Sequence, residues 1–153
     1  MYTWAYEKQP VGRARYTLMT DIAGVVIDDG VACRLAPNHY YVTATTSGVD
    51  QVYRAMTWFN VQWKMYVDVA YSAVNLAGPK ARAIVQSLAT DIDFSKEAFP
   101  YMGVRTGTLA GIPVRILRVG FVGEAGYEIH CPAGYGEALW DTLMAAGKPH
   151  GLK

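Results

Sequence analysis

The sequence predicts an α+β fold in which the sheets are largely antiparallel. Short segments rich in β-branched and aromatic residues, several of which alternate apolar with polar positions, indicate strands. Longer segments that place apolar residues at helical spacing indicate helices. The predicted order, β-β-β-β-α-β-α-β-β-β-α, is typical of an α+β domain. Of the 153 residues, 52% are hydrophobic and 18% are charged, so the chain has enough apolar material for a core.

The first part of the chain predicts strands separated by short turns. Tyr16 and Leu18, with β-branched threonines around them and polar flanks, indicate the first strand. A tight turn is expected at 21–24 and a turn or bulge at 28–30, because an Asp-Gly pair favours such a backbone. Another turn is expected at the Pro-Asn pair 37–38. The strands expected between these turns span 13–20, 25–27, 31–35 and 40–45.

The middle of the chain predicts two helices on either side of a strand. Ser47 is a good N-cap for a helix over 49–64, whose apolar residues share one face that we interpret as ordinary core packing. A strand is expected over 66–76, and a Gly-Pro pair at 78–79 then opens the second helix. The segment 91–100 is expected to be irregular. The apolar faces are Val49, Val52, Tyr53, Met56, Phe59 and Trp63 in the first helix, and Ala83, Ile84 and Leu88 in the second.

The last part of the chain predicts three strands and a helix. The first two strands are expected to pair through a short turn at 110–112. An amphipathic helix is expected over 135–146, and Gly147 fits its C-cap. The three expected strands span 104–109, 113–121 and 126–131.

Charge and cysteine usage argue against several classes of function. The formal net charge is +1 and the basic residues are scattered, which disfavours a nucleic-acid partner. No apolar run reaches the roughly 18 residues of a membrane span. The polar N-terminus is no signal peptide, so a cytoplasmic protein is expected.

Cys33 and Cys131 have no metal-ligand spacing, so no metal is expected. A disulfide between them stays open as an alternative. We interpret both cysteines as small buried residues in strands.

A pair of adjacent carboxylates is the first candidate for chemistry. Asp28 and Asp29 follow an apolar strand, and neighbouring strand residues point to opposite faces of a sheet. The two carboxylates are therefore not expected to act together. An inward carboxylate could act as a general base or orient a nitrogen. The alternative is that both aspartates only form a turn before Gly30.

The glycine-rich segment 120–128 is the second candidate. A phosphate-binding loop would have to open a helix, but a strand is predicted here, so no dinucleotide site is expected. Glu128 lies inside an apolar strand, where a desolvated carboxylate needs a partner. A ligand with a fork of N–H donors would provide one; alternatively, Glu128 points to water. The histidines, His39, His130 and His150, form no catalytic constellation and are interpreted as structural or solvated.

Several segments, taken in order, resemble the aminomethyltransferase family, which includes the T-protein of the glycine cleavage system. RYTLMTD at 15–21 and GVVIDDG at 24–30 are similar to its folate-binding segment. LAGP at 76–79 and GFVGEAGYEI at 120–129 match its later motifs. Within the family, the threonine-rich YVTATTSG at 41–48 resembles the aminomethyltransferase-like region of the sarcosine oxidase alpha subunit. Segments with the same resemblance are 98–102, 111–113 and 135–140.

The resemblance implies roles for individual residues. Asp29 corresponds to the catalytic carboxylate, which in relatives lies beside the reacting nitrogens of a reduced folate. Glu128 corresponds to the glutamate that grips the amino-pyrimidine edge of the pterin. Tyr16, Tyr41 and Thr43 correspond to positions that line the folate pocket. Tetrahydrofolate is the implied cofactor, and flavin would belong to a partner domain or to flavin-bearing oxidase subunits.

A reaction and a partial domain follow from the same resemblance. The expected reaction is tetrahydrofolate-dependent one-carbon transfer coupled to oxidative demethylation of an N-methyl amine such as sarcosine, giving 5,10-methylenetetrahydrofolate. Two alternatives stay open, an aminomethyltransferase of the glycine cleavage system and a non-catalytic folate-binding protein. The family's N-terminal glycine-rich segment and C-terminal barrel are not recognised here. The expected organisation is therefore a lead-in over 1–12 and a partial folate-binding domain over 13–153.

Overall fold

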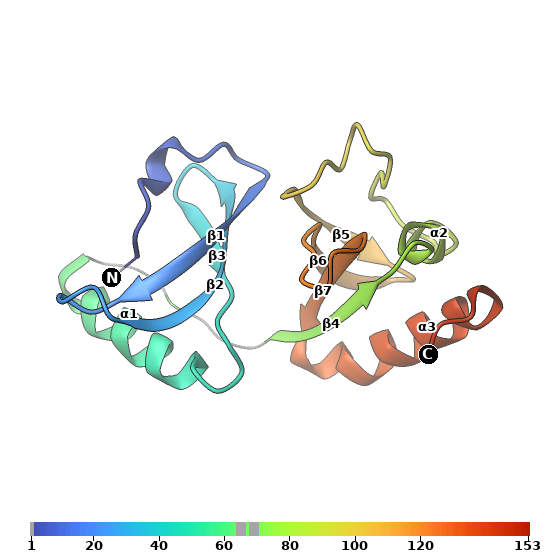
Figure 1. The fold of residues 1–153 in the computed structure, drawn as a ribbon. Helices are drawn as coiled ribbons and strands as arrows, with labels where there is room; N and C mark the ends of the chain where they lie inside the picture. Colours follow the sequence, from blue (N-terminus) through green and yellow to red (C-terminus); the bar gives the residue numbers. More distant parts are fainter. Residues whose placement is uncertain (1, 64–66, 68–70) are drawn as a thin grey trace. The chain divides into compact units, whose positions relative to one another are not determined.

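The computed structural model describes residues 2–63, 67 and 71–153 of the chain (Figure 1). The chain separates into two compact units, Met1–Val69 and Ala70–Lys153. Each unit has its own antiparallel sheet and at least one helix, so the predicted α+β class is confirmed. Within the described residues, no helix is both long enough and apolar enough to cross a membrane.

The first unit contains the strands β1 (Arg13–Thr20), β2 (Val26–Ala36) and β3 (His39–Val42), with the 3-10 helix η1 (Tyr6–Lys8) before them and the helix α1 (Val49–Trp63) after them. The three strands form an antiparallel sheet in the order β1-β2-β3. The predicted turn between β1 and β2 is confirmed, because Asp21 Oδ1 accepts the amides of Ala23 and Val25 at 2.8 and 2.9 Å. This Asx-type turn lets the chain reverse into β2.

β2 is one continuous strand, which corrects the prediction of two strands with a turn at 28–30. β2 pairs with β1 without a break from Arg34 to Asp28. Gly30 lies inside this ladder, and a Cβ at that position would clash with the carbonyl oxygen of Thr43. The glycine therefore marks a close approach of two backbones within a sheet and not a turn.

The segment before β1 is tied to the sheet by polar contacts. The Tyr6 and Thr17 hydroxyl groups are hydrogen-bonded to each other. The side-chain amide of the buried Gln9 donates to the carbonyl oxygens of Arg13 and Ala32 at 2.7 and 2.9 Å. Such bonds offset the cost of burying polar groups. The boundary that we expect between a lead-in and the domain stays a prediction.

Helix α1 confirms the expected helix, and Lys64 lies outside the described residues. The Thr45 hydroxyl accepts the Gly48 amide at 3.0 Å in front of the helix, whereas the sequence predicts Ser47 as the cap. On the expected apolar face, Val52 is buried but Tyr53 is exposed. The core face of α1 is therefore only partly covered within the described residues.

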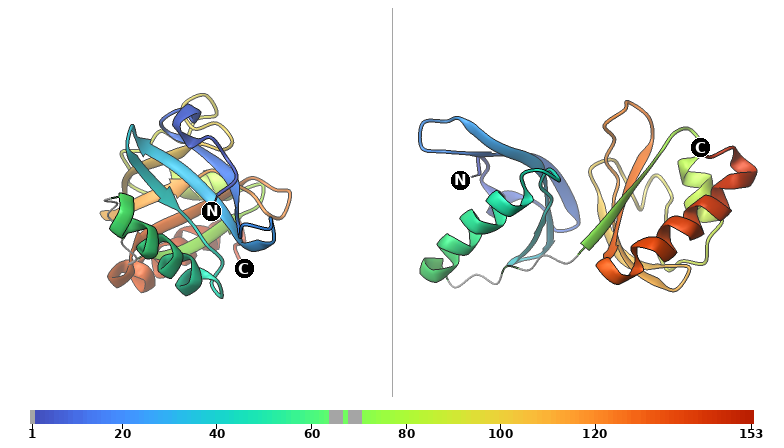
Figure 2. Two further views of the ribbon diagram at one scale, coloured as in Figure 1. Left: turned by 90° about the vertical axis from the view of Figure 1, so that its left-hand side faces the viewer. Right: turned by 90° about the horizontal axis from the view of Figure 1, so that it is seen from below.

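The second unit contains β4 (Tyr71–Ala77), α2 (Ala81–Gln86), β5 (Val104–Leu109), β6 (Ile112–Leu117), β7 (Gly126–Pro132) and α3 (Gly136–Gly147), with the 3-10 helices η2 (Ala133–Tyr135) and η3 (Lys148–His150) flanking α3. Its strands form an antiparallel sheet in the order β4-β7-β6-β5 (Figure 2). The strand predicted over 66–76 begins at Tyr71 in the structure, and 66 and 68–70 lie outside the described residues. The irregular segment predicted over 91–100 is confirmed.

The β5–β6 hairpin turns through two residues. Ala110 and Gly111 both have positive φ angles, 50° and 80°, which is the backbone that a tight hairpin between twisted strands requires. β6 ends at Leu117, so the strand predicted to reach residue 121 is shorter. Residues 118–125 instead form an irregular connection to β7.

The two helices of the second unit differ in detail from the prediction. Helix α2 begins at Ala81 and buries Ala81, Ile84 and Val85, whereas the predicted Ala83 is exposed. Gly147 is the last residue of α3 and has a right-handed backbone, so it is not the predicted left-handed cap. Its role is to make room, because a Cβ there would clash with the side chain of Leu152.

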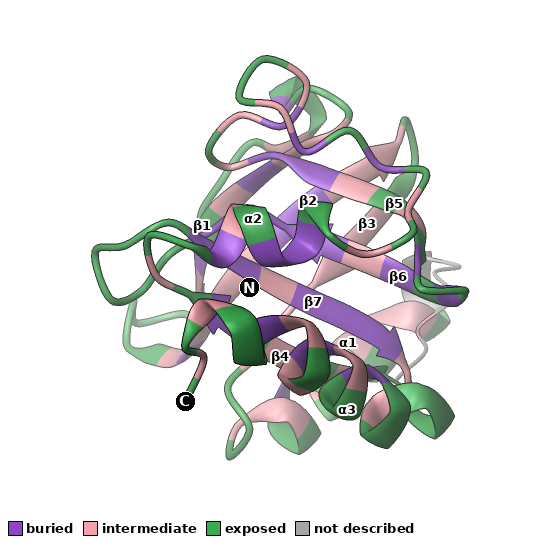
Figure 3. Ribbon diagram, turned by 90° about the vertical axis from the view of Figure 1, so that its right-hand side faces the viewer, coloured by how far each residue is buried: buried purple, intermediate pink, exposed green. Residues whose placement is uncertain are grey.

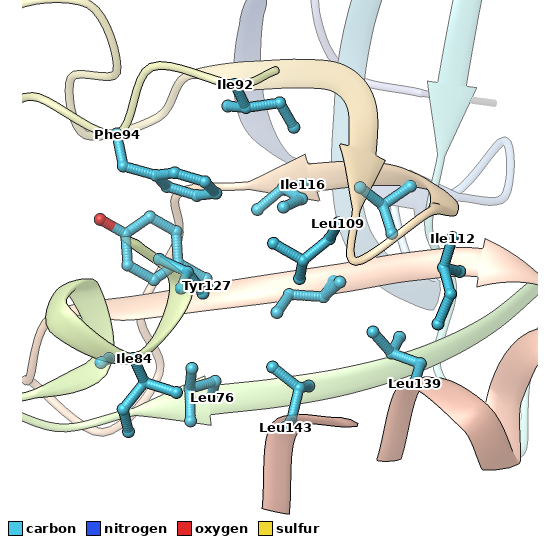
Figure 4. Close-up of a cluster of buried hydrophobic side chains, with 14 of the residues drawn as sticks. Leu76, Ile84, Ile92, Phe94, Leu109, Ile112, Ile116, Tyr127, Leu139 and Leu143 are labelled. Atoms are coloured by element: carbon cyan, nitrogen blue, oxygen red, sulfur yellow. The ribbon is translucent and has the colours of Figure 1, made fainter. Parts of the chain in front are cut away.

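The core of the second unit lies between one face of its sheet and the helices α2 and α3. In Figure 4, Leu139 and Leu143 of α3 point toward the same cluster as Leu76 of β4. Figure 3 shows buried residues along β6 and β7. The rings of Phe94, Phe99 and Tyr127 lie 5.5 to 5.9 Å apart between centroids within this cluster.

The two cysteines are buried in strands, as the sequence analysis favours. Cys33 lies in β2 of the first unit and Cys131 lies in β7 of the second unit. Both side chains are fully buried, which is typical of cysteine as a small apolar residue.

Candidate functional site

Asp28 is the inward carboxylate of the adjacent pair, and its partner is Thr45. The Thr45 hydroxyl donates to Asp28 Oδ1 at 2.6 Å, and the Thr45 amide donates to Oδ2 at 3.1 Å. Asp28 is buried, so these bonds offset the desolvation of its carboxylate. The same Thr45 hydroxyl accepts the Gly48 amide, which links Asp28 to the start of α1. Asp28 is therefore engaged in holding the fold together.

Asp29 lies on the opposite face of β2 and is partly exposed. The hydroxyl of Tyr16 in β1 donates to Asp29 Oδ2 at 2.7 Å. This hydrogen bond to a carboxylate is the largest cause of a raised Tyr16 pKa, followed by desolvation and by the charge of Asp29. The Tyr16 side chain is 53% exposed, so the pair lies at the surface of the first unit. Asp29 thus presents a carboxylate that is oriented from one side and accessible from another.

Thr43 and Tyr41, also expected at the site, are both tied to the edge of β2. The Thr43 hydroxyl accepts the Val31 amide at 2.9 Å, and the Thr43 amide donates to the Val31 carbonyl at 2.9 Å. Tyr41 pairs with Cys33 in the β2–β3 ladder, which places it on the Asp29 face by strand alternation. In this chain Thr43 therefore continues the sheet past β3, and its hydroxyl is committed to a backbone amide.

Glu128 lies in β7 of the second unit, beside a histidine that we interpret from sequence only as structural or solvated. The Glu128 side chain is 31% exposed, and His130 is 6% exposed. His130 Nε2 lies 3.5 Å from Glu128 Oε2, which makes an ion pair when the imidazole is protonated. The sequence signal for this contact is the spacing of two positions in a strand, which puts both side chains on one face.

The site residues predicted from sequence fall in two groups. Asp29, Tyr16, Tyr41 and Thr43 belong to the three-stranded sheet of the first unit, and the structure brings Tyr16 and Asp29 into contact. Glu128 belongs to the sheet of the second unit. The exposed connection 120–125 leads into β7, so no helix opens where a phosphate loop would need one. In the described part of the chain, no three His, Cys, Asp or Glu side chains gather as a metal site.

Comparison with known proteins gives consistent results for the whole chain. The family described as the GCVT N-terminal domain matches residues 1–153. The sarcosine oxidase subunit alpha of Rhizobium meliloti is 38% identical over 162 residues, which cover 99% of this chain and 16% of that protein. The aminomethyltransferase of Streptomyces avermitilis is 36% identical over 146 residues, which cover 93% of this chain and 38% of that protein. The chain thus spans well under half the length of these relatives.

Solved structures with a similar fold include the following two. The glycine cleavage system aminomethyltransferase T from Bartonella henselae has a TM-score of 0.74 and 20% identity, covering 90% of this chain and 37% of that chain. The heterotetrameric sarcosine oxidase from Corynebacterium sp. U-96, in complex with pyrrole 2-carboxylate, has a TM-score of 0.63 and 20% identity, covering 94% and 68%. At this identity the likeness shows the fold alone. The match over all 153 residues shows the family, and the chain therefore belongs to the GCVT N-terminal domain family.

Proposed function

We propose that this chain forms part of a tetrahydrofolate-dependent one-carbon transferase, coupled to oxidative demethylation of an N-methyl amine such as sarcosine. The observation that carries the proposal is the Tyr16–Asp29 pair, an oriented and accessible carboxylate at the position that the family resemblance marks as catalytic. Its neighbour Asp28 is occupied by Thr45 and is unsuited to that role. Relatives named as sarcosine oxidase alpha subunits and aminomethyltransferases support the reaction class.

The Glu128 carboxylate is suited to bind one edge of a reduced folate. The amino-pyrimidine edge of a pterin offers neighbouring N–H donors, and a carboxylate accepts such a fork in bidentate fashion. Glu128 is partly exposed, so its oxygens can be reached by a ligand without a structural change in β7. Tetrahydrofolate would supply the nitrogens that accept the one-carbon unit.

The chemical contribution of this chain is positioning and charge. Asp29 would hydrogen-bond the reacting nitrogen or take its proton, and its negative charge would stabilise a cationic imine nearby. Tyr16 keeps one Asp29 oxygen in place, so the other oxygen has a defined direction. Glu128 would fix the orientation of the pterin ring by accepting the N–H donors of its amino-pyrimidine edge.

The oxidation step belongs to another domain or subunit in this proposal. A flavin-bearing partner would oxidise the methylamine, and the imine that results would be consumed with formation of 5,10-methylenetetrahydrofolate and the demethylated amine. The heterotetrameric sarcosine oxidase with this fold supports an assembly of that kind. The likeness to aminomethyltransferases supports the second candidate, aminomethyl transfer in the glycine cleavage system.

The proposal is tested by titrating the purified chain with tetrahydrofolate in a calorimeter, under reducing and anaerobic conditions. We expect saturable binding that an Asp29→Asn, Glu128→Ala double variant loses. Asp141→Asn, an exposed carboxylate on α3, is the matched control and should bind like the wild type. A folded wild-type chain that gives no heat above dilution would contradict a folate site built from these residues.

The roles of the two carboxylates are separated by the single variants. Glu128→Ala should raise the dissociation constant, because it removes the acceptor of the pterin fork. Asp29→Asn should retain most of the binding while it abolishes one-carbon transfer in the holoenzyme. Retained transfer in Asp29→Asn would assign the chemistry to another residue. A wild-type holoenzyme that binds folate but transfers no carbon would favour a non-catalytic folate-binding protein.

A further inference from the structure

His130 lies directly beside Glu128 on one face of β7. The two residues are two positions apart in the strand, so their side chains project to the same side. The opposite side of β7 carries Tyr127, Ile129 and Cys131, which belong to the apolar core. His130 Nε2 lies 3.5 Å from Glu128 Oε2, which is within ion-pair distance. His130 is thus a nearly buried titratable group that the proposed reaction does not yet use.

The neighbouring strands define the surroundings of this pair. Across the β6–β7 ladder, Arg115 lies opposite His130 and Leu117 lies opposite Glu128. The buried Leu117 gives Glu128 an apolar flank that offers no hydrogen bond. The Arg115 guanidinium lies over the ring of Tyr71 in β4, 5.1 Å from its centroid.

The β4 strand completes these surroundings on the other side of β7. Ala73 lies opposite His130, and Asn75 lies opposite Glu128. The ionisable groups on this face are therefore the Glu128 carboxylate, the His130 imidazole, the Arg115 guanidinium and the Tyr71 phenol. His130 lies opposite Arg115 across the β6–β7 ladder, and its Nε2 lies 3.5 Å from Glu128 Oε2.

We infer that His130 is a positioning residue that holds the Glu128 carboxylate in the orientation that receives the pterin. This inference rests on the proposed function, since it assigns a task to a second residue of the same site. A free glutamate side chain has several rotamers, and a ligand that binds it must order them. With Oε2 directed at the imidazole, Oε1 and the outer lone pair of Oε2 remain for the N–H fork.

The test is a set of tetrahydrofolate titrations of the chain with wild-type, His130→Phe and His130→Gln sequences, each alone and combined with Glu128→Gln. Phenylalanine keeps the ring volume but removes Nε2, whereas glutamine keeps an N–H donor near its position. We expect His130→Phe to raise the dissociation constant about tenfold, because it removes the ring nitrogen that lies at ion-pair distance from Glu128 Oε2. His130→Gln should stay within about threefold of the wild type. In the Glu128→Gln background, His130→Phe should add nothing.

A measurement without ligand tests the contact itself and guards against a folding defect. The ring nitrogen signals of His130 in long-range proton–nitrogen NMR spectra should shift when Glu128→Gln is introduced, while circular dichroism stays unchanged. If His130→Phe fails to fold, the His130→Gln titrations and the ring signals still decide the question.

The possible results separate the two proposals. Wild-type binding that His130→Phe leaves unchanged, or weakens equally in the Glu128→Gln background, would overturn the role of His130 and leave the folate site standing. A folded wild-type chain that binds no tetrahydrofolate would overturn the proposed function, and the role of His130 with it. Ring signals that do not change with Glu128→Gln would overturn the contact and, with it, the role of His130, and would leave the folate site standing.

Discussion

The two units of this chain stabilise their interiors in different ways. The second unit encloses an apolar cluster contributed by every strand of its sheet and by α2 and α3. Of the four buried polar or charged residues among those described, Gln9, Thr17 and Asp28 lie in the first unit. The first unit thus relies on directed polar contacts, whereas the second relies on apolar burial, which has no preferred direction.

This difference bears on where an oriented carboxylate can be built. Apolar packing tolerates small shifts, but a hydrogen bond defines a distance and an angle for the group that it holds. Asp28 is fixed by Thr45 on one face of β2, and Asp29 is oriented by Tyr16 on the other. Hydrogen bonds within the sheet of the first unit therefore define the position and orientation of the proposed catalytic carboxylate more narrowly than apolar packing would.

The largest effect is expected from a cavity in the second unit. Phe99 is fully buried against Phe94 and Tyr127, so Phe99→Ala should lower the free energy of unfolding by about 3–5 kcal/mol. Phe121→Ala is the matched control, because Phe121 is 95% exposed and should change stability little. Urea denaturation gives both values. Equal losses of stability in the two variants would show that burial of Phe99 does not stabilise the second unit, which would contradict the reliance of this unit on apolar burial.

A smaller effect is expected from the polar anchor of the first unit. Asp28→Ala leaves the Thr45 amide and hydroxyl without their acceptor and should cost about 1–3 kcal/mol. Asp29→Ala, one position along, should stay within about 0.5 kcal/mol, since its partner Tyr16 is exposed. Amide hydrogen exchange should show faster opening of β1–β3 in Asp28→Ala only. Protection of these strands that is equal in the two variants would show that Asp28 is no anchor.

The smallest effect concerns the ionisation of Tyr16. Its pKa is raised above the ordinary value of tyrosine mainly by the hydrogen bond to Asp29, so ultraviolet titration of wild type minus Tyr16→Phe should show late ionisation. Asn at position 29 should move this pKa back toward the ordinary value. Because the folded pKa is the higher one, the stabilisation is present below the unfolded pKa and is lost as pH rises through the folded pKa. An unchanged titration in Asp29→Asn would argue against the bond in solution.

The strands themselves were largely predictable because their cues are local. Alternation of side chains separated Asp28 from Asp29 correctly, and it needed only the geometry of a single strand. The turn predicted at 28–30 was wrong. An Asp-Gly pair is a local cue for a turn, and it does not indicate whether another strand lies beside the glycine. Gly30 is required by the carbonyl of Thr43, which reaches it only after β3 has folded back.

The contact between Glu128 and His130 has a signal in the sequence, because the two residues are two positions apart in one predicted strand. The spacing of the three histidines does not support a catalytic constellation, and from sequence they are interpreted as structural or solvated. The spacing of two in a strand already places His130 on the Glu128 face. Whether that face is open or covered depends on the strands beside β7, and their register is set by pairing between residues far apart in the sequence.

By itself, the sequence determined the α+β class, the alternation along β2 and β7, and the family to which the chain belongs, because side-chain period and motif order are carried by the chain locally. Only the tertiary structure decided that Thr45 is hydrogen-bonded to Asp28, that Tyr16 is hydrogen-bonded to Asp29, and that His130 lies at ion-pair distance from Glu128. These contacts join side chains through sheet register, loop return and burial. Such features arise when the whole unit folds, so no single segment contains them.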